Sequence, residues 1–132
     1  METDCSTRLR VLIADDVRDT LMTVGIILRS EGFDVRLAER GTEVPATVEE
    51  FQPHAVLLDI TRLDGNRLEL ARELKRRYGN RCPVLIAITG KNADDTKPLA
   101  ALSGFSYFIS KPCDPDVLLG LVARIQPANE SN

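Results

Sequence analysis

Several features that mark common protein classes are missing from this 132-residue sequence. No apolar stretch approaches the roughly 20 residues that a membrane span requires, and the acidic start at residues 1–4 is unlike a signal peptide. The three cysteines, Cys5, Cys82 and Cys113, form no CxxC pair and have no histidine beside them. This arrangement is typical of reduced thiols and not of a disulfide framework or a zinc site. We therefore expect a cytoplasmic protein without membrane insertion.

A large excess of one charge is missing as well. Lys and Arg together number 17 and Asp and Glu 20, so the net charge is −3. Nonspecific nucleic-acid binding needs a basic surface that neutralises phosphates, so we expect no nucleic-acid partner. The basic run at residues 75–77 is interpreted as the last turn of a solvated helix, where the helix dipole favours positive charge. Repeats and low-complexity linkers are absent, and the length fits one domain with its own core.

Short apolar runs that end abruptly at polar residues are the main feature that the sequence does contain. A run with no polar position fits a strand that is buried on both faces of a sheet. Residues 33–37 instead alternate between apolar and charged side chains, which is typical of an edge strand. The apolar runs are residues 11–14 before Asp15 and Asp16, 55–58 before Asp59, 84–88 before Thr89, and 107–110 before Lys111.

Helical patterns are expected between these strands. Leu21, Val24 and Leu28 recur at helical spacing, and Gly32 follows as a stop signal. The other boundary signals are Thr42 as the cap of the second helix, Gly79 as the end of the third, Pro98 near the start of a short fourth, and Asp114 as the cap of the fifth.

The alternation of strands and helices predicts the fold class. Five strands alternating with five helices indicate an α/β fold, a single doubly wound five-stranded parallel sheet with helices on both faces. Right-handed crossovers and the edge character of the second strand favour the flavodoxin-like strand order 2-1-3-4-5. We expect this domain to cover residues 9–126, with a flexible N-terminus at 1–8 and a flexible tail at 127–132.

The predicted strand order gathers charged residues at one edge of the sheet. The first and third strands become neighbours, so Asp15, Asp16 and Asp59 are expected to converge at the topological switch point. Three carboxylates repel one another unless a cation joins them, and oxygen ligands of this kind suit Mg²⁺. A carboxylate is also a nucleophile toward phosphorus, while Lys111 and Thr89 are suited to hold phosphoryl oxygens. Helix caps and solvated loop acids are the alternatives for each residue alone, but they explain the joint placement poorly.

An ordered set of residues resembles the receiver domain of two-component response regulators, the CheY-like superfamily. The set consists of Asp15, Asp16, Asp59, Thr89, Lys111 and Pro112. The resemblance implies Mg²⁺-dependent phosphorylation of Asp59 by a histidine kinase or a histidine phosphotransfer protein. A receiver of this kind accepts a phosphoryl group and is not otherwise an enzyme, although it can assist its own phosphorylation and dephosphorylation.

The resemblance also implies roles for the metal ligands. Asp16 and Asp59 are expected to bind Mg²⁺ directly, Asp15 to act through water, and Thr61 to offer its backbone carbonyl.

Signalling roles are implied by the same resemblance. Thr89 and Phe108 match the positions that respond to phosphorylation, and a downstream protein partner is expected at the face formed by the fourth helix, fifth strand and fifth helix. Pro112 is a candidate for a cis peptide bond. The local sequences around Thr89 and Lys111 are more like those of receivers attached to hybrid sensor kinases than like those of receivers fused to DNA-binding domains. A stand-alone regulator and an excised receiver both remain open.

The loop after Asp59 departs from the family pattern. Only five residues separate Asp59 from Gly65, where members of the family usually have a longer loop that includes a proline. Arg62 in this loop offers a positive charge that would weaken metal binding if it reached the acidic pocket; an exposed Arg62 is the simpler alternative.

Other functions compete with phosphorylation of Asp59 as explanations of the pattern. One alternative is a receiver-like protein-binding scaffold that is not phosphorylated because of the shortened loop. A phosphatase of the haloacid dehalogenase type would need an acid where Thr61 stands, and a flavodoxin would not place Asp15 and Asp16 where a flavin phosphate binds.

Overall fold

The computed structural model describes residues 9–60, 66–90, 97–111 and 114–125. Its centre is a five-stranded parallel sheet in the order β2-β1-β3-β4-β5, which confirms the predicted order. The strands are β1 (Arg10–Ala14), β2 (Asp34–Ala38), β3 (Ala55–Asp59), β4 (Val84–Thr89) and β5 (Tyr107–Ser110). The α-helices are α1 (Arg18–Ser30), α2 (Val44–Phe51), α3 (Asn66–Tyr78), α4 (Lys97–Ser103) and α5 (Pro115–Ala123), and 3-10 turns occupy η2 (Gly41–Glu43) and η3 (Gly79–Arg81).

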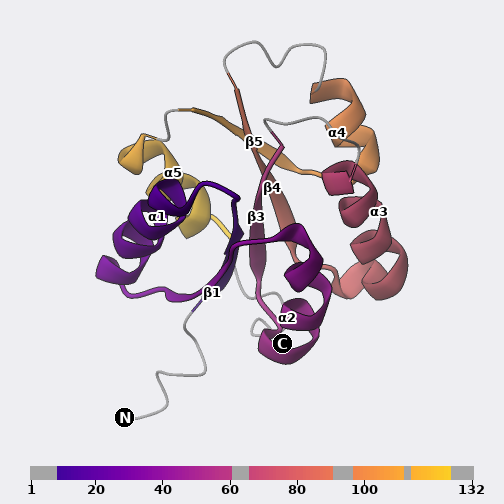
Figure 1. Cartoon of the computed structure of the whole chain (residues 1–132), viewed down its shortest axis with the longest axis horizontal. Helices are drawn as coiled ribbons and strands as arrows, with labels where there is room; N and C mark the ends of the chain where they lie inside the picture. Colours follow the sequence, from indigo (N-terminus) through magenta and orange to yellow (C-terminus); the bar gives the residue numbers. More distant parts are fainter. Residues whose placement is uncertain (1–8, 61–65, 91–96, 112–113, 126–132) are drawn as a thin grey trace.

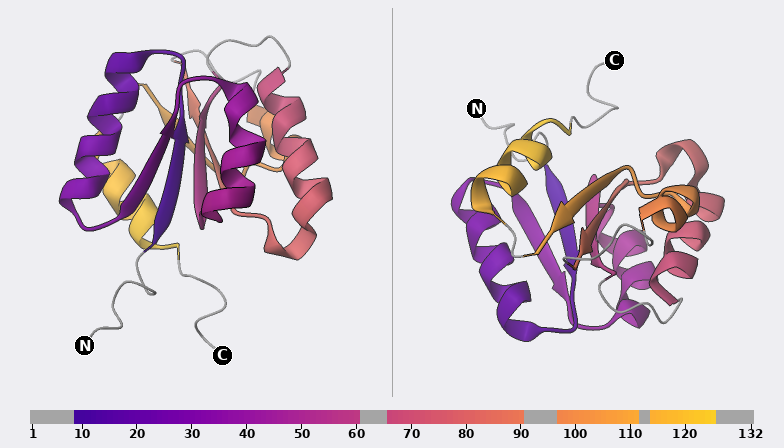
Figure 2. Two further views of the ribbon diagram at one scale, coloured as in Figure 1. Left: turned by 60° about the horizontal axis from the view of Figure 1, so that its bottom comes forward. Right: turned by 90° about the horizontal axis from the view of Figure 1, so that it is seen from above.

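Helices cover both faces of the sheet, so the molecule has three layers (Figure 1). The two rotated views place α1 and α5 together on one face and α2, α3 and α4 on the other (Figure 2). The central strands bury side chains in both directions: Leu57 packs in the layer of α1 and α5, while Val56 and Leu58 pack in the opposite layer. Every residue of β3 is buried, and β2 lies at an edge of the sheet, as the sequence predicts.

Helix boundaries follow the sequence signals with one exception. The Asp114 carboxylate accepts a hydrogen bond of 2.8 Å from the backbone N–H of Asp116, which confirms it as the N-cap of α5. The prediction that Thr42 caps α2 is wrong, because Thr42 lies inside the preceding 3-10 turn. The N-cap of α2 is Glu43, whose carboxylate instead accepts a hydrogen bond from the backbone N–H of Glu39.

Within the described ranges, no helix has the length and apolar character needed to cross a membrane.

Candidate functional site

The carboxyl ends of the four strands β1, β3, β4 and β5 meet at one rim of the sheet. Ala14 of β1 pairs with Leu58 of β3, so the residues that follow them, Asp15 and Asp59, stand side by side. On the other side of β3, Thr89 of β4 pairs with Ser110 of β5, directly before Lys111. Parallel pairing in this register therefore brings together residues that are up to 96 positions apart in the sequence.

Lys111 and Asp59 form a close ion pair at this rim. The Nζ atom of Lys111 lies 2.6 Å from Oδ2 of Asp59 and 4.0 Å from Oδ2 of Asp15. The backbone N–H of Lys111 donates a 2.8 Å hydrogen bond to the carbonyl of Thr89, which fixes the start of the side chain. Asp59 is only 9% exposed, so the ammonium group stabilises a carboxylate that has lost most of its solvent.

Asp15 is the most buried acid of the rim, with 1% of its surface exposed. Its Oδ1 atom accepts a 2.9 Å hydrogen bond from the backbone N–H of Val17 at the start of α1, while its Oδ2 atom is buried without a hydrogen-bond partner. Burial, together with the negative charge of Asp59, raises the pKa of Asp15 from 3.8 to about 6. The carboxyl of Asp15 is therefore harder to ionise than that of an exposed aspartate.

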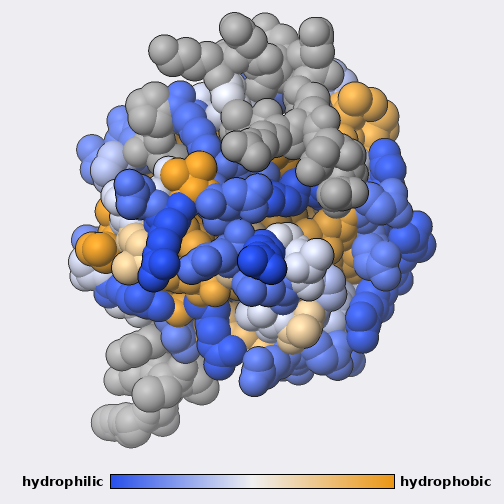
Figure 3. All heavy atoms as spheres, viewed as in Figure 1, coloured by the Kyte–Doolittle hydropathy of each residue, from blue (hydrophilic) through white to orange (hydrophobic). Residues whose placement is uncertain are grey.

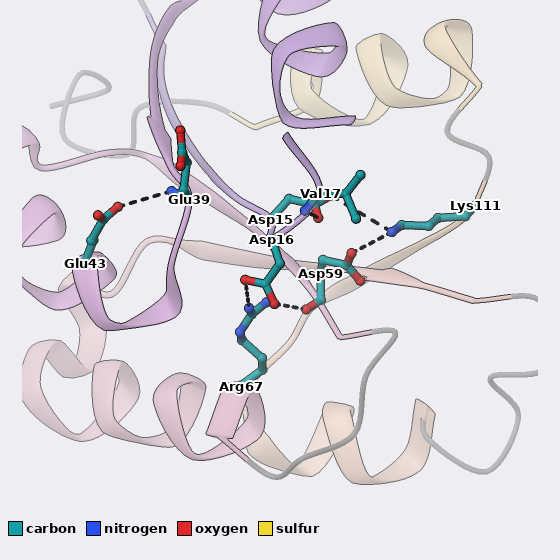
Figure 4. A network of polar contacts seen from close by, with 8 residues as sticks. All are labelled: Asp15, Asp16, Val17, Glu39, Glu43, Asp59, Arg67 and Lys111. Carbon is teal, nitrogen blue, oxygen red and sulfur yellow. Dashed lines mark hydrogen bonds and ion pairs between the residues drawn. The ribbon is translucent and has the colours of Figure 1, made fainter. Parts of the chain in front are cut away.

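Asp16 points away from Lys111 and toward Arg67 at the start of α3 (Figure 4). The Nη2 atom of Arg67 lies 2.7 Å from Oδ1 of Asp16, and its Nη1 atom donates a 2.6 Å hydrogen bond to the backbone carbonyl of Asp59. The three predicted carboxylates therefore divide between two cations: Asp15 and Asp59 face Lys111, and Asp16 faces Arg67.

Arg67 is the residue of this site that sequence reasoning missed. The sequence directed attention to Arg62 as a cation near the acids, and Arg62 lies outside the described residues. One signal was present in the sequence: a cation in the first turn of a helix opposes the helix dipole, so an arginine there needs an anionic partner.

The two residues assigned to switching lie on adjacent strands. Thr89 is 1% exposed, and its hydroxyl donates a long hydrogen bond of 3.4 Å to the carbonyl of Ile109. Phe108 is half-buried and packs against the core layer beneath α2, α3 and α4. Thr61 and Pro112 both lie outside the described residues.

The donor chemistry at the rim fits a magnesium ion, although the described side chains do not converge on one point. Carboxylate oxygens are the ligands that Mg²⁺ prefers, and the Oδ2 atom of Asp15 lacks a hydrogen bond that a metal-bound water would supply. Among the residues that the structure describes, no group of three His, Cys, Asp or Glu side chains is arranged to hold a metal ion. Figure 4 shows Asp16 turned toward Arg67, with which it forms an ion pair.

Residues 11–123 match the family model of the response regulator receiver domain. The chain belongs to this family. Receiver domains are components of two-component signalling; they usually bind Mg²⁺, interact with histidine kinases and phosphotransfer proteins, and are generally not classical enzymes.

Curated relatives of this receiver domain are longer proteins. The chain is 37% identical over 117 residues to the CAI-1 autoinducer sensor kinase/phosphatase CqsS of Vibrio cholerae, covering 86% of this chain and 17% of that protein. It is 33% identical over 119 residues to the DNA-binding response regulator MtrA of Mycobacterium tuberculosis, covering 90% of this chain and 50% of that protein. The receiver thus spans from about a sixth to half of the length of these relatives.

Solved receiver structures share the fold. The CheY-like receiver domain protein of Methanospirillum hungatei matches with a TM-score of 0.79 and 26% identity, over 89% of this chain and 93% of that one. The receiver domain of yeast Ssk1, solved in complex with the histidine phosphotransfer protein Ypd1, matches with a TM-score of 0.81 and 21% identity, over 91% of this chain and 90% of that chain.

Proposed function

We propose that this receiver domain, with limits at residues 9–126, accepts a phosphoryl group on Asp59 and passes the signal to a protein partner. The observation that carries the proposal is the contact of 2.6 Å between Lys111 and Asp59 at the rim of the sheet, beside the buried Asp15. A nucleophilic carboxylate, a fixed ammonium and a second acid are the groups that transfer of a phosphoryl group to an aspartate requires.

The transfer itself is a displacement at phosphorus. An oxygen of Asp59 forms a bond to phosphorus while the bond between phosphorus and the donor breaks, and the donor keeps the electron pair of that bond. With a phosphohistidine donor, the imidazole that leaves then takes a proton from water. Asp59 becomes an acyl phosphate, and Lys111 is already placed to hold one of the new phosphoryl oxygens.

The acids of the rim would hold Mg²⁺ for this reaction. The proposed ligands are Asp16, Asp59 and the backbone carbonyl of Thr61, with Asp15 acting through water. A bound Mg²⁺ supplies positive charge that screens the approach of an anionic donor to an anionic carboxylate.

Thr89 and Phe108 would transmit the effect of phosphorylation at Asp59 to the surface. The hydroxyl of Thr89 makes only a long hydrogen bond to the Ile109 carbonyl, so a phosphoryl oxygen is a better acceptor for it. A turn of Thr89 toward the phosphoryl group would vacate space next to β5, where Phe108 is half-buried. These two residues are proposed as the switch that links Asp59 to the outer surface of β5.

Partners are proposed at two surfaces. A histidine kinase or a histidine phosphotransfer protein would deliver the phosphoryl group at the rim, and a downstream protein would bind the face of α4, β5 and α5. That face exposes Leu99, Leu102 and Tyr107, of which Leu102 is 82% exposed. Figure 3 shows apolar surface at the upper right, over α4. Exposed apolar side chains that lie close together are typical of protein interfaces.

A second function is supported by the ion pair between Arg67 and Asp16. Since Arg67 already neutralises one of the proposed metal ligands, the domain would serve as a protein-binding scaffold that is never phosphorylated if the pair excludes Mg²⁺ entirely. This alternative retains the fold and the exposed face of α4 and β5.

The test is intact-protein mass spectrometry after incubation with acetyl phosphate, with and without Mg²⁺. We expect one phosphoryl adduct that requires Mg²⁺ and is absent from Asp59→Asn. Asp34→Asn, at an exposed position of β2, is the matched control and should form the adduct as the wild type does. A phosphorylated histidine phosphotransfer protein serves as a second donor.

Failure of both donors to label a correctly folded wild-type protein would refute phosphorylation of Asp59 and favour the scaffold. An adduct that survives in Asp59→Asn would show that another residue is modified.

A further inference from the structure

Arg67 is the least exposed arginine among the ion pairs that the structure describes. Its side chain is 13% exposed, whereas the side chain of its partner Asp16 is 48% exposed. Other arginine pairs, such as Arg36 with Glu50, are about half exposed on the arginine side or more and contribute little on general grounds. The pair of Arg67 is different because solvent screens it less.

The surroundings of Arg67 are shaped to receive its side chain. One guanidinium nitrogen is bound to the Asp59 carbonyl at the end of β3 and the other to Asp16 in the segment between β1 and α1. The stem passes over Gly41 of η2, where an added Cβ atom would lie 3.1 Å from Nε of Arg67. A side chain at Gly41 would crowd the arginine, so the glycine leaves room for a guanidinium that two other segments bind.

A second, independent feature of the rim is a buried carboxylate oxygen of Asp15 that accepts no hydrogen bond. The Oδ2 atom of Asp15 is buried without a hydrogen-bond partner, in a side chain that is 1% exposed. Lys111 is 4.0 Å away from this atom and makes its short contact with Asp59 instead. Arg67 supplies charge on the Asp16 side of the rim, whereas the buried Oδ2 atom of Asp15 makes the longer of the two Lys111 contacts and no hydrogen bond.

We propose that Arg67 is a built-in cation of the acidic rim that competes with Mg²⁺ for Asp16 and thereby sets a low affinity of the domain for the metal. This inference rests on the proposed function only in taking Asp16 and Asp59 as residues that hold Mg²⁺. The guanidinium lies 2.7 Å from Oδ1 of Asp16, so a divalent ion held by this carboxylate would be repelled by the positive charge of Arg67. Phosphorylation at Asp59 would then depend on the local Mg²⁺ concentration or on a partner that draws Arg67 away.

The experiment measures Mg²⁺ binding directly, without a phosphoryl donor. Calorimetric and NMR titrations with MgCl₂ are compared for the wild type, Arg67→Gln, Arg67→Lys and Arg72→Gln. Arg67→Gln removes the charge, and we expect it to bind Mg²⁺ about tenfold more tightly, the scale on which residues behind metal ligands act. Arg67→Lys keeps the charge but cannot make both guanidinium contacts, so its affinity for Mg²⁺ should lie between those of the wild type and Arg67→Gln.

Arg72→Gln is the matched control. Arg72 lies on the same helix and pairs with Glu69 at the surface, away from the acidic rim. Its loss changes the net charge by the same amount as Arg67→Gln, so an equal gain in Mg²⁺ affinity for both variants would overturn the proposal in favour of a general charge effect.

Thermal unfolding gives a second measurement that does not depend on the metal titration. In EDTA, Arg67→Gln should unfold at a lower temperature than the wild type, because Asp16 has lost the cation with which it pairs. Excess Mg²⁺ should then raise the unfolding temperature of Arg67→Gln more than that of the wild type.

The outcomes separate this inference from the proposed function. Wild-type binding of Mg²⁺ with equal or weaker binding by Arg67→Gln would overturn the competition and assign Arg67 to positioning Asp16. Tighter binding by Arg67→Gln without any adduct on Asp59 would support the competition while refuting phosphorylation. Absence of Mg²⁺ binding at millimolar concentration in every variant would overturn both the competition and the metal site.

Discussion

Asp15 offers the sharpest test of the electrostatics at the rim, because its carboxyl is buried and one of its oxygens has no hydrogen bond. Asp15→Asn removes the charge and keeps an oxygen that accepts the hydrogen bond from Val17. We expect the substitution to stabilise the metal-free protein at neutral pH, although it changes a residue of the proposed metal site.

The magnitude follows from the pKa of Asp15, which burial raises from 3.8 to about 6. The folded protein holds the proton more tightly than the unfolded chain, so this group favours folding fully below its unfolded pKa, and that advantage is lost as the pH rises through about 6. The cost of ionising Asp15 in the folded state is then less than about 1 kcal/mol at pH 4, about 2 kcal/mol at pH 5 and about 3 kcal/mol at pH 7.5.

The assay is urea unfolding in EDTA at these three pH values, followed by circular dichroism because the chain has no tryptophan. The difference in free energy of unfolding between Asp15→Asn and the wild type should grow with pH along that curve. Asp34→Asn, exposed on β2, controls for the loss of one negative charge. A difference that stays constant or shrinks between pH 4 and pH 7.5 would refute the claim that desolvation raises the pKa of Asp15. Saturating Mg²⁺ should reduce the difference, since the metal favours the ionised carboxylate.

Further predictions concern the core and two glycines. Leu57→Ala, in the fully buried strand β3, should lower the free energy of unfolding by about 2–5 kcal/mol. Leu102→Ala, at an exposed position of α4, should change it by less than about 0.5 kcal/mol. Similar losses for both variants in urea unfolding would contradict the assigned burial. Gly104→Ala should destabilise the domain by about 1–3 kcal/mol, because Gly104 has φ of +120° and an added Cβ would lie 2.7 Å from Cγ of Lys75. Gly120→Ala, in the interior of α5 with no atom within 4 Å of the added Cβ, should instead raise the free energy of unfolding by about 0.5–1 kcal/mol. If both variants shifted the unfolding temperature in the same direction, the difference in space and backbone conformation between the two glycines would be contradicted.

Local patterns in the sequence were sufficient for the architecture. Fully apolar runs predicted the central strands, alternation placed β2 at an edge, and the sheet has the predicted order. Asp114 and Pro115 predicted the start of α5, and Pro98 predicted a short α4 that begins at Lys97. These features depend on residues within a few positions of one another, so that periodicity and capping chemistry reveal them.

Thr42 illustrates where a local signal fails. Threonine is a good cap in isolation, but the segment before α2 forms a 3-10 turn closed by a hydrogen bond from the N–H of Glu43 to the carbonyl of Arg40. The packing of η2 beside α3 and the bond between Glu39 and Glu43 determine where the helix begins, and neither follows from capping preference alone.

The strand ends that carry acids, a hydroxyl and an ammonium could be located from the chain alone, because each apolar run and the polar residue after it are adjacent in sequence. How those charges pair depends on the packing of distant segments. The ion pair of Arg67 with Asp16 joins residues 51 positions apart, and that of Lys111 with Asp59 joins residues 52 positions apart. Side-chain direction, burial and the space above Gly41 select these partners, and all three arise from packing between elements. The residue types that provide the chemistry can therefore be predicted from the chain, whereas the cation that each acid binds is set by the fold.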